Sequence, residues 1–274
     1  MLRTRLWTAA VALPATIAIL LFAPNAFFTA VIAIFTAWGL YEIITMIKAS
    51  GLEALLVIVI GAVSALPPLL MGGVGASRVM VIVVAVAMLA WVVAVAREGA
   101  EKLAHVQESK LRKWGLKTPL FSIGALWVGV LFPYFALLRN APGGIPIIIL
   151  MLLLVVASDS GAYFVGRSLG RTKLLPRVSP NKTVEGAIGG LAACILAGLI
   201  LRPLLAPRWA SGTVAILAAV VGVLAQFGDA AGSAFKRVAG VKDSGWIFPG
   251  HGGLLDRTCS LVFAAAFTYY YLLG

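Results

Sequence analysis

The chain of 274 residues is 61% hydrophobic and only 12% charged, with a mean hydropathy of +1.03, and this composition excludes an ordinary soluble domain. Its formal net charge of +12 therefore favours a membrane protein whose basic rim faces anionic lipid over a nucleic-acid-binding protein. The two cysteines, Cys194 in an apolar stretch and Cys259 in a polar one, imply no disulfide framework.

Nine apolar stretches are each long enough to cross a membrane core of about 30 Å. They cover residues 6–22, 26–47, 54–71, 79–96, 119–138, 145–166, 184–205, 213–235 and 254–273. The sequence therefore predicts an all-α polytopic membrane protein with about nine transmembrane helices. The first stretch resembles a signal peptide in composition, but Pro24-Asn25 forms a turn directly into the next apolar run, which favours a retained first span.

The basic residues favour one orientation of these spans. With the N-terminus in the cytoplasm, 18 of the 22 Lys and Arg residues lie on the cytoplasmic side, and the outside turns keep only Arg78, Arg139, Arg202 and Arg208. Lys and Arg accumulate in cytoplasmic loops of membrane proteins. We therefore expect a multi-pass protein of the cytoplasmic membrane with its C-terminus outside.

Residues 1–118 form the predicted N-terminal transmembrane scaffold. Its conspicuous polar residue is Glu42, a carboxylate close to membrane depth. Two interpretations remain open: Glu42 forms the wall of a site or pairs with a basic residue, or it reaches cytoplasmic water at the rim near Lys48. Residues 97–118 are predicted to form an amphipathic helix on the inner leaflet.

Residues 119–274 form the predicted catalytic region, and its first polar group lies at residues 157–190. Asp159, Tyr163 and Arg167 recur every four residues, which places a polar stripe on an otherwise apolar helix. A second carboxylate near the inner end of its own span, Asp229, favours a binding site over a purely structural Asp159.

The loop after this helix carries Lys173, Arg177 and Lys182. Ser179-Pro180 is predicted to be the N-cap and first residue of the next helix, so Lys182 would lie in its first turn beside free N–H groups that suit phosphate. Positive charge retained in the cytoplasm is the alternative explanation of such a loop. Glycines 186 and 190, four residues apart, allow close packing of that helix.

The second polar group occupies residues 226–260. A helix is predicted up to about residue 238, with Asp229, Ser233, Lys236 and Arg237 on one face. Five glycines and one proline between residues 240 and 253 predict a loop with exposed N–H groups that suits phosphate binding. A new helix is predicted to open at about residue 254.

The second group resembles the signature of the phosphatidate cytidylyltransferases. The matching positions are Ser233, Lys236, Arg237, Lys242, Asp243, Pro249, His251, Gly252, Gly253, Asp256 and Arg257. Residues 159–163 and 179–186 are similar to an upstream part of the same family. The chain departs from the pattern at Cys259, where the family has a carboxylate, and at Gly232, where a glutamate is frequent.

This resemblance implies transfer of a cytidylyl group from CTP to phosphatidate. Joining two polyanions requires cations and positioned donors more than a protein nucleophile, and oxygen ligands suit Mg²⁺. Asp229 and Asp256 are the expected Mg²⁺ ligands, with Asp159 as the third, and a second cation is an open alternative. The expected catalytic residues are Asp229, Asp256, Lys236 and Arg237, and the expected substrate-binding residues are Lys182, Ser233, Arg257, His251, Lys173 and Arg177.

Two other functions remain as alternatives. A CTP-dependent lipid kinase of the polyprenol or dolichol type would use the same nucleotide, and a secondary transporter would also carry charged residues at membrane depth. The expected partners are CTP, phosphatidate and anionic membrane lipid, with no nucleic acid. Small-residue helix faces and the resemblance also make a homodimer one expected arrangement.

Overall fold

The protein is described from a computed structural model, which describes residues 14–71, 76–99, 118–247 and 252–273. Residues 14–22 are helical, so every apolar stretch with described residues forms helix and the all-α prediction is confirmed. The later helices are α2 (Asn25–Met46), α3 (Leu52–Met71), α4 (Ala76–Glu98), α6 (Thr118–Leu131), α7 (Pro133–Asn140), α8 (Gly144–Leu169), α9 (Val184–Leu205), α10 (Ser211–Val238) and α11 (Leu255–Leu273).

Six helical segments of the described chain are long and apolar enough to cross a membrane. They are Asn25–Met46, Ser77–Arg97, Ser122–Asn140, Gly144–Leu169, Val184–Leu205 and Ser211–Val238. The segment Ser122–Asn140 joins α6 to α7 through Pro133, and α3 carries Pro67 and Pro68 within its length. The chain is thus a multi-pass membrane protein, while the count of nine spans and the orientation remain predictions.

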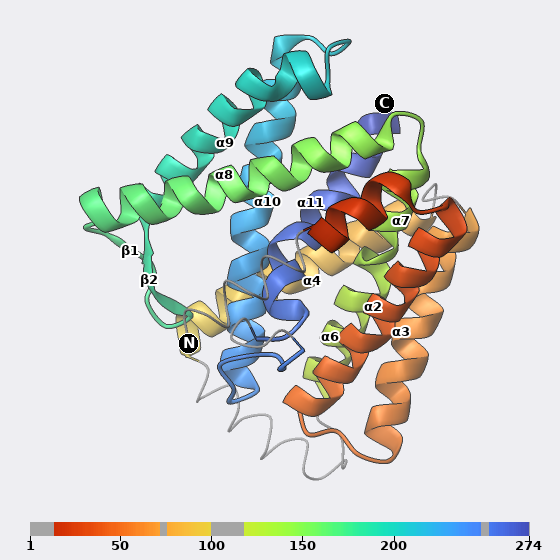
Figure 1. Cartoon of the computed structure of the whole chain (residues 1–274). Helices are drawn as coiled ribbons and strands as arrows, with labels where there is room; N and C mark the ends of the chain where they lie inside the picture. The colour runs from red at the N-terminus through yellow and green to blue at the C-terminus, as the bar shows by residue number, and fades with distance from the viewer. Residues whose placement is uncertain (1–13, 72–75, 100–117, 248–251, 274) are drawn as a thin grey trace.

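The helices form two groups on either side of a central pair (Figure 1). Helices α10 and α11 pack against each other in the centre, with α8 and α9 on one side and α2, α3, α6 and α7 on the other. Helices α8 and α9 approach closely because their contact contains glycine. A Cβ at Gly186 would lie 2.8 Å from the Ala162 carbonyl oxygen, and one at Gly190 would lie 2.7 Å from that of Ser158. The predicted close packing is therefore confirmed.

A short β-hairpin joins α8 to α9 and corrects one prediction. Strand β1 (Lys173–Leu175) pairs antiparallel with β2 (Ser179–Thr183), so Ser179-Pro180 does not begin a helix. The residue before a proline favours extended backbone, and the cap is supplied instead by Thr183, whose hydroxyl accepts the Gly186 N–H at 3.1 Å. Lys182 consequently lies on the strand that enters α9.

A carboxylate in the first turn of α9 holds the base of this hairpin. Glu185 accepts the backbone N–H of Arg171 at 3.0 Å and that of Thr172 at 3.1 Å. These two hydrogen bonds connect the start of the hairpin to the start of α9. They fix the strand that carries Lys182 relative to the helix.

Replacing Thr183 by alanine tests this cap. Thr183 is buried, and loss of an N-cap hydroxyl typically costs about 1 kcal/mol of stability. We expect Thr183→Ala to lower the free energy of unfolding by about that amount, measured by denaturation of the detergent-solubilised protein. Thr183→Ser keeps the hydroxyl and should retain most of the stability, so equal losses in both variants would contradict the cap.

Three predicted features lie wholly or partly outside the described residues. The amphipathic helix predicted for residues 97–118 is described only at its ends, where α4 continues to Glu98 and α6 begins at Thr118. The first span is described from residue 14 onward. His251 in the glycine-rich loop also lies outside the described residues.

Candidate active site

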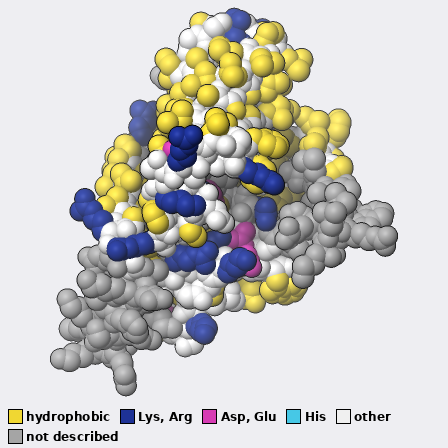
Figure 2. Space-filling model, turned by 90° about the vertical axis from the view of Figure 1, so that its left-hand side faces the viewer, with side chains coloured by type: hydrophobic (Ala, Val, Ile, Leu, Met, Phe, Trp, Pro, Cys, Tyr) yellow, Lys and Arg dark blue, Asp and Glu magenta, His cyan; other side chains and the backbone are white. Residues whose placement is uncertain are grey.

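A polar cavity of about 650 Å³ opens where α8, β2, α9, α10 and α11 meet. Its charged lining residues come from four of these elements and are Asp159, Arg167, Lys182, Asp229, Asp256 and Arg257. Figure 2 shows Lys and Arg side chains gathered around a hollow on this face of the molecule, between broad apolar surfaces. The structure thus brings together charged residues that are up to about 100 positions apart in the sequence.

One acidic residue of the cavity pairs with the lysine of the hairpin. The Lys182 Nζ lies 2.5 Å from Asp229 Oδ2. Both side chains remain partly exposed, with exposed fractions of 27% for Lys182 and 43% for Asp229. This ion pair is therefore open to solvent and to ligands, and both groups can exchange partners at modest cost.

The second acidic residue is held much more firmly. Lys236 Nζ lies 2.5 Å from Asp256 Oδ1, and the Asp256 side chain is only 7% exposed. The other carboxylate oxygen, Oδ2, accepts the backbone N–H of Ser244 at 2.8 Å and that of Gly253 at 2.9 Å. Asp256 is thus oriented by one lysine and two backbone donors, while its Oδ1 faces the lysine.

A glycine on α10, Gly228, allows these two carboxylates to share one cavity. A Cβ at Gly228 would overlap the carbonyl oxygen of Cys259 on α11. Helices α10 and α11 therefore touch backbone to backbone at this level. The contact places Asp229, next to Gly228, and Asp256, one turn before Cys259, on the wall of the same cavity.

The polar stripe predicted on α8 faces this cavity. Asp159, Tyr163 and Arg167 all line it. Arg167 Nη1 donates a hydrogen bond to the Tyr163 hydroxyl at 2.8 Å, and all three side chains are exposed. The stripe therefore adds one more carboxylate and one more guanidinium to the cavity wall.

The donor chemistry of this wall fits a hard divalent cation. Mg²⁺ is usually bound through one or two carboxylates, substrate phosphates and water, not by a cage made of protein alone. Asp159 and Asp229 present exposed or half-exposed carboxylates to the cavity. In the described part of the chain, no cluster of three or more His, Cys, Asp and Glu side chains forms a preassembled metal site, and the buried Cys259 offers only a soft thiol.

Several predicted site residues do not line the cavity. Lys173 and Arg237 are exposed, and Ser233 is half-buried on α10. Arg177 donates to the backbone oxygen of Arg97 at the end of α4, away from the cavity. Arg257, by contrast, lines the cavity beside Asp256.

The sequence did not reveal several polar residues of the site. Asn181 and Gln226 line the cavity, and Ser244 donates to Asp256. Neutral side chains next to charged ones carry no distinctive spacing, so only the folded arrangement identifies them. Glu42 also contacts this region, because it is buried with an exposed fraction of 2% and accepts a hydrogen bond from the Ser244 hydroxyl, which excludes the rim interpretation.

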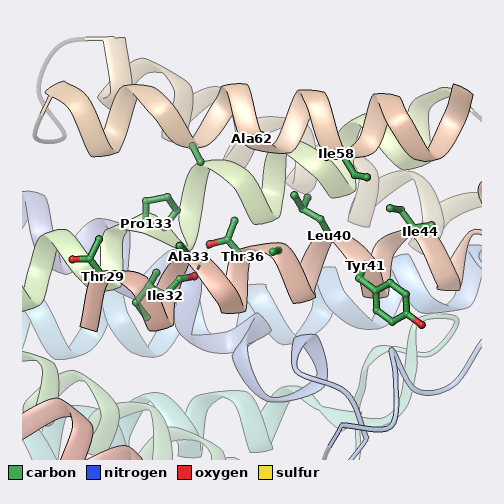
Figure 3. A pocket seen from close by; sticks show the side chains of 12 residues that line it. Thr29, Ile32, Ala33, Thr36, Leu40, Tyr41, Ile44, Ile58, Ala62 and Pro133 are labelled. Atoms are coloured by element: carbon green, nitrogen blue, oxygen red, sulfur yellow. Dashed lines mark hydrogen bonds between the residues drawn. The ribbon is translucent and has the colours of Figure 1, made fainter. Parts of the chain in front are cut away.

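A second pocket, of about 420 Å³, has a different character (Figure 3). It lies between α2 and α3, and apart from Pro133 its lining residues belong to these two helices. The Thr29 and Thr36 hydroxyls donate to carbonyl oxygens of their own helix, those of Asn25 and Ile32. None of the described residues that line it carries a charge. Phosphate chemistry therefore belongs to the polar cavity.

Comparison with known proteins agrees with this arrangement. The model of the cytidylyltransferase family matches residues 3–273. Similar curated proteins include the phosphatidate cytidylyltransferase of Brucella suis biovar 1 (strain 1330), 46% identical over 53% of this chain and 54% of its own length. That of Bacillus subtilis (strain 168) is 40% identical over 55% of this chain and 56% of its own length.

A further relative carries no assigned activity in its name. The uncharacterized protein YnbB of Escherichia coli (strain K12) is 40% identical over 56% of this chain and 54% of its own length. The chain thus spans about half the length of the curated relatives that it matches. Because the family model covers nearly all of the sequence, the resemblance found in the sequence is confirmed, and the chain belongs to the cytidylyltransferase family.

Proposed function

We propose that this protein transfers a cytidylyl group from CTP to phosphatidate, forming CDP-diacylglycerol and releasing pyrophosphate. The observation that carries the proposal is the pair of lysine–carboxylate contacts, Lys182 with Asp229 and Lys236 with Asp256, beside one polar cavity. Family membership and the names of the relatives support it.

The reaction joins a phosphate oxygen of the lipid to the α-phosphorus of CTP and breaks the bond from that phosphorus to the pyrophosphate. The attacking phosphate monoester is already largely ionised near neutral pH, so the site needs no protein nucleophile. What it needs is positive charge that offsets the repulsion between two polyanions. Lys182 and Arg257 supply that charge from the cavity wall, and Lys236 adds to it from behind the wall through its contact with Asp256.

The same residues explain how the site can hold charge before substrate arrives. Each lysine is neutralised by a carboxylate, so neither charge is left uncompensated. When CTP enters, Lys182 exchanges Asp229 for phosphate oxygens, and Asp229 becomes available to a cation. We propose that Asp229 and Asp159, with Asp256, would hold Mg²⁺, which would offset phosphate charge and stabilise the leaving pyrophosphate.

The remaining predicted site residues have supporting roles in this proposal. Lys173 lies on the hairpin next to the cavity and Arg237 at the exposed end of α10, where both attract anionic lipid. His251 would bind phosphate oxygens, Ser233 would support the face of α10 that carries Asp229, and Arg177 holds the hairpin to the end of α4.

We further propose that this cavity faces the cytoplasm. The arginines predicted to lie outside are found at the other end of the helices. Arg139 contacts the turn that precedes α2, donating to the carbonyl oxygen of Ala23, and Arg78 lies over the ring of Tyr270 near the end of α11. The cavity charges lie at the end of α10 and the beginning of α11. The two sets of basic residues therefore occupy opposite ends of the bundle, as the positive-inside rule requires.

The proposal is tested with CTP labelled in two positions. Purified protein in detergent with phosphatidate and Mg²⁺ should convert cytidine-labelled CTP into lipid-soluble label and release pyrophosphate in equal amount. CTP labelled in the γ-phosphate should give no lipid label, because that phosphate leaves with pyrophosphate. Lipid label from the γ-phosphate alone would identify a lipid kinase instead. Absence of lipid label from both labelled forms of CTP would overturn the proposal.

A further inference from the structure

A buried carboxylate that lies far from the signature residues in the sequence contacts the start of α11 in the fold. Glu42 lies on α2 with an exposed fraction of 2%. Its Oε1 accepts the backbone N–H of Leu254 at 2.7 Å, and its Oε2 accepts that of Leu255 at 2.9 Å. Among the described residues, no basic side chain forms an ion pair with Glu42. Its charge is therefore balanced by helix N–H groups.

These donors are the free N–H groups that every helix leaves at its first turn. A nearby side chain usually accepts them, whereas here the acceptor is 212 and 213 residues away in the sequence. The negative charge also faces the positive end of the α11 dipole, which stabilises both partners. The indole N–H of Trp38 also donates to Glu42 Oε1, at 3.2 Å.

Glycine at two positions leaves space for this carboxylate. A Cβ at Gly253 would lie 2.6 Å from both Glu42 oxygens, and one at Gly245 would lie 2.7 Å from Oε1. Any side chain at residue 253 would thus displace the carboxylate from the start of α11. The close approach to Glu42 is therefore one physical reason for glycine at both positions.

The segments that Glu42 holds are the same segments that orient Asp256. The Ser244 hydroxyl lies 2.7 Å from Glu42 Oε2, while the Ser244 backbone N–H donates to Asp256 Oδ2 at 2.8 Å. Gly253 donates to Asp256 at 2.9 Å, directly before the two residues that donate to Glu42. Movement of Glu42 would therefore shift both backbone donors of Asp256.

We infer that Glu42 is a positioning residue of the active site, which acts through the start of α11 and Ser244 on the orientation of Asp256. This inference rests on the proposed function for its kinetic consequence. Its structural part, the contact between a charged carboxylate and the N–H groups of residues 254 and 255, stands independently.

The kinetic test is Glu42→Gln, which keeps the size of the side chain but replaces one acceptor oxygen by a donor. Removing a group that orients an active-site ligand typically costs 10- to 100-fold in activity. We expect kcat to fall by about that factor and the Mg²⁺ concentration for half-maximal activity to rise, with little change in the KM for CTP. Glu42→Asp keeps the charge and should retain more activity than Glu42→Gln.

A matched control and a second readout separate positioning from general stability. Glu53→Gln makes the same chemical change in the first turn of α3 and should leave kcat and the Mg²⁺ requirement unchanged. Hydrogen exchange of peptides that cover residues 252–260 should be faster in Glu42→Gln than in the wild type, and exchange in α9 should be unchanged. This readout needs no activity, so it remains decisive if the proposed reaction fails.

Three results would overturn the inference. The first is unchanged exchange at residues 254 and 255 in Glu42→Gln, and the second is a loss of activity that follows only the amount of folded protein. The third concerns Ser244→Ala, which removes the hydrogen bond between Ser244 and Glu42 without leaving a buried charge unpaired. If the losses in kcat of Ser244→Ala and Glu42→Gln are fully additive, the two residues do not act as one unit.

Discussion

Replacing Asp229 by asparagine is expected to lower kcat for cytidylyl transfer by about 100- to 1000-fold, the range found when one preorganised electrostatic contact is removed from an active site. Asparagine preserves the shape of the side chain but neither pairs with Lys182 as an ion nor offers a charged ligand to a cation. The measurement is the rate of lipid-soluble cytidine label at saturating CTP and phosphatidate.

This loss should not come from unfolding. Asp229 and Lys182 are 43% and 27% exposed, and an exposed ion pair contributes only about 0–1 kcal/mol. The unfolding midpoint of Asp229→Asn should therefore stay close to that of the wild type. Glu53→Gln, a neutralised carboxylate outside the cavity, is the matched control. Wild-type kcat in Asp229→Asn would exclude Asp229 from the reaction.

Replacing Lys236 by methionine is expected to have the largest effect on stability. Asp256 is only 7% exposed and Lys236 17%, so the substitution leaves a largely buried carboxylate without its counter-ion. Breaking such a pair costs roughly 3 kcal/mol, at the lower end of the usual range, because two backbone N–H groups still donate to Asp256. We expect the free energy of unfolding to fall by that amount and cytidylyl transfer to be lost.

A double variant shows whether the penalty arises from the unpaired charge. Asp256→Asn combined with Lys236→Met removes both charges, so its stability should exceed that of Lys236→Met alone. Lys242→Met, in the exposed part of the loop, should change stability by less than about 0.5 kcal/mol. Simple additivity of the two single substitutions would show that the pair does not couple.

The helices were predictable because membrane-spanning segments must satisfy their backbone hydrogen bonds internally. Apolar length placed α9 at residues 184–205, and the glycine-rich stretch that follows α10 predicted its end at about residue 238, as the structure has them. The hairpin was not predictable in this way. Its strands have three and five residues and carry no apolar alternation, and both Ser179 and Thr183 are suitable cap residues. Tertiary contacts of Glu185 decide between them.

The site was predictable where it follows helix spacing. The stripe on α8 could be inferred from residues four apart, whereas on α10 only Asp229 of the predicted polar face lines the cavity and Lys236 reaches it through Asp256. The partners of those residues could not, because Lys182 and Asp229 lie 47 positions apart, and Glu42 is more than 200 positions from Ser244. Sequence spacing identifies residues on one helix face, whereas contacts between helices depend on how glycines such as Gly228 let the backbones approach.

The separation between Glu42 and its hydrogen-bond partners also has a consequence for biosynthesis. Helix α2 leaves the ribosome about 200 residues before the start of α11, so its carboxylate enters the membrane region before its backbone donors exist. An unsatisfied carboxylate at that depth costs about 3 kcal/mol. A chain truncated before residue 254 would lack both of these backbone donors, so Glu42 would have to find other partners or stay in contact with water.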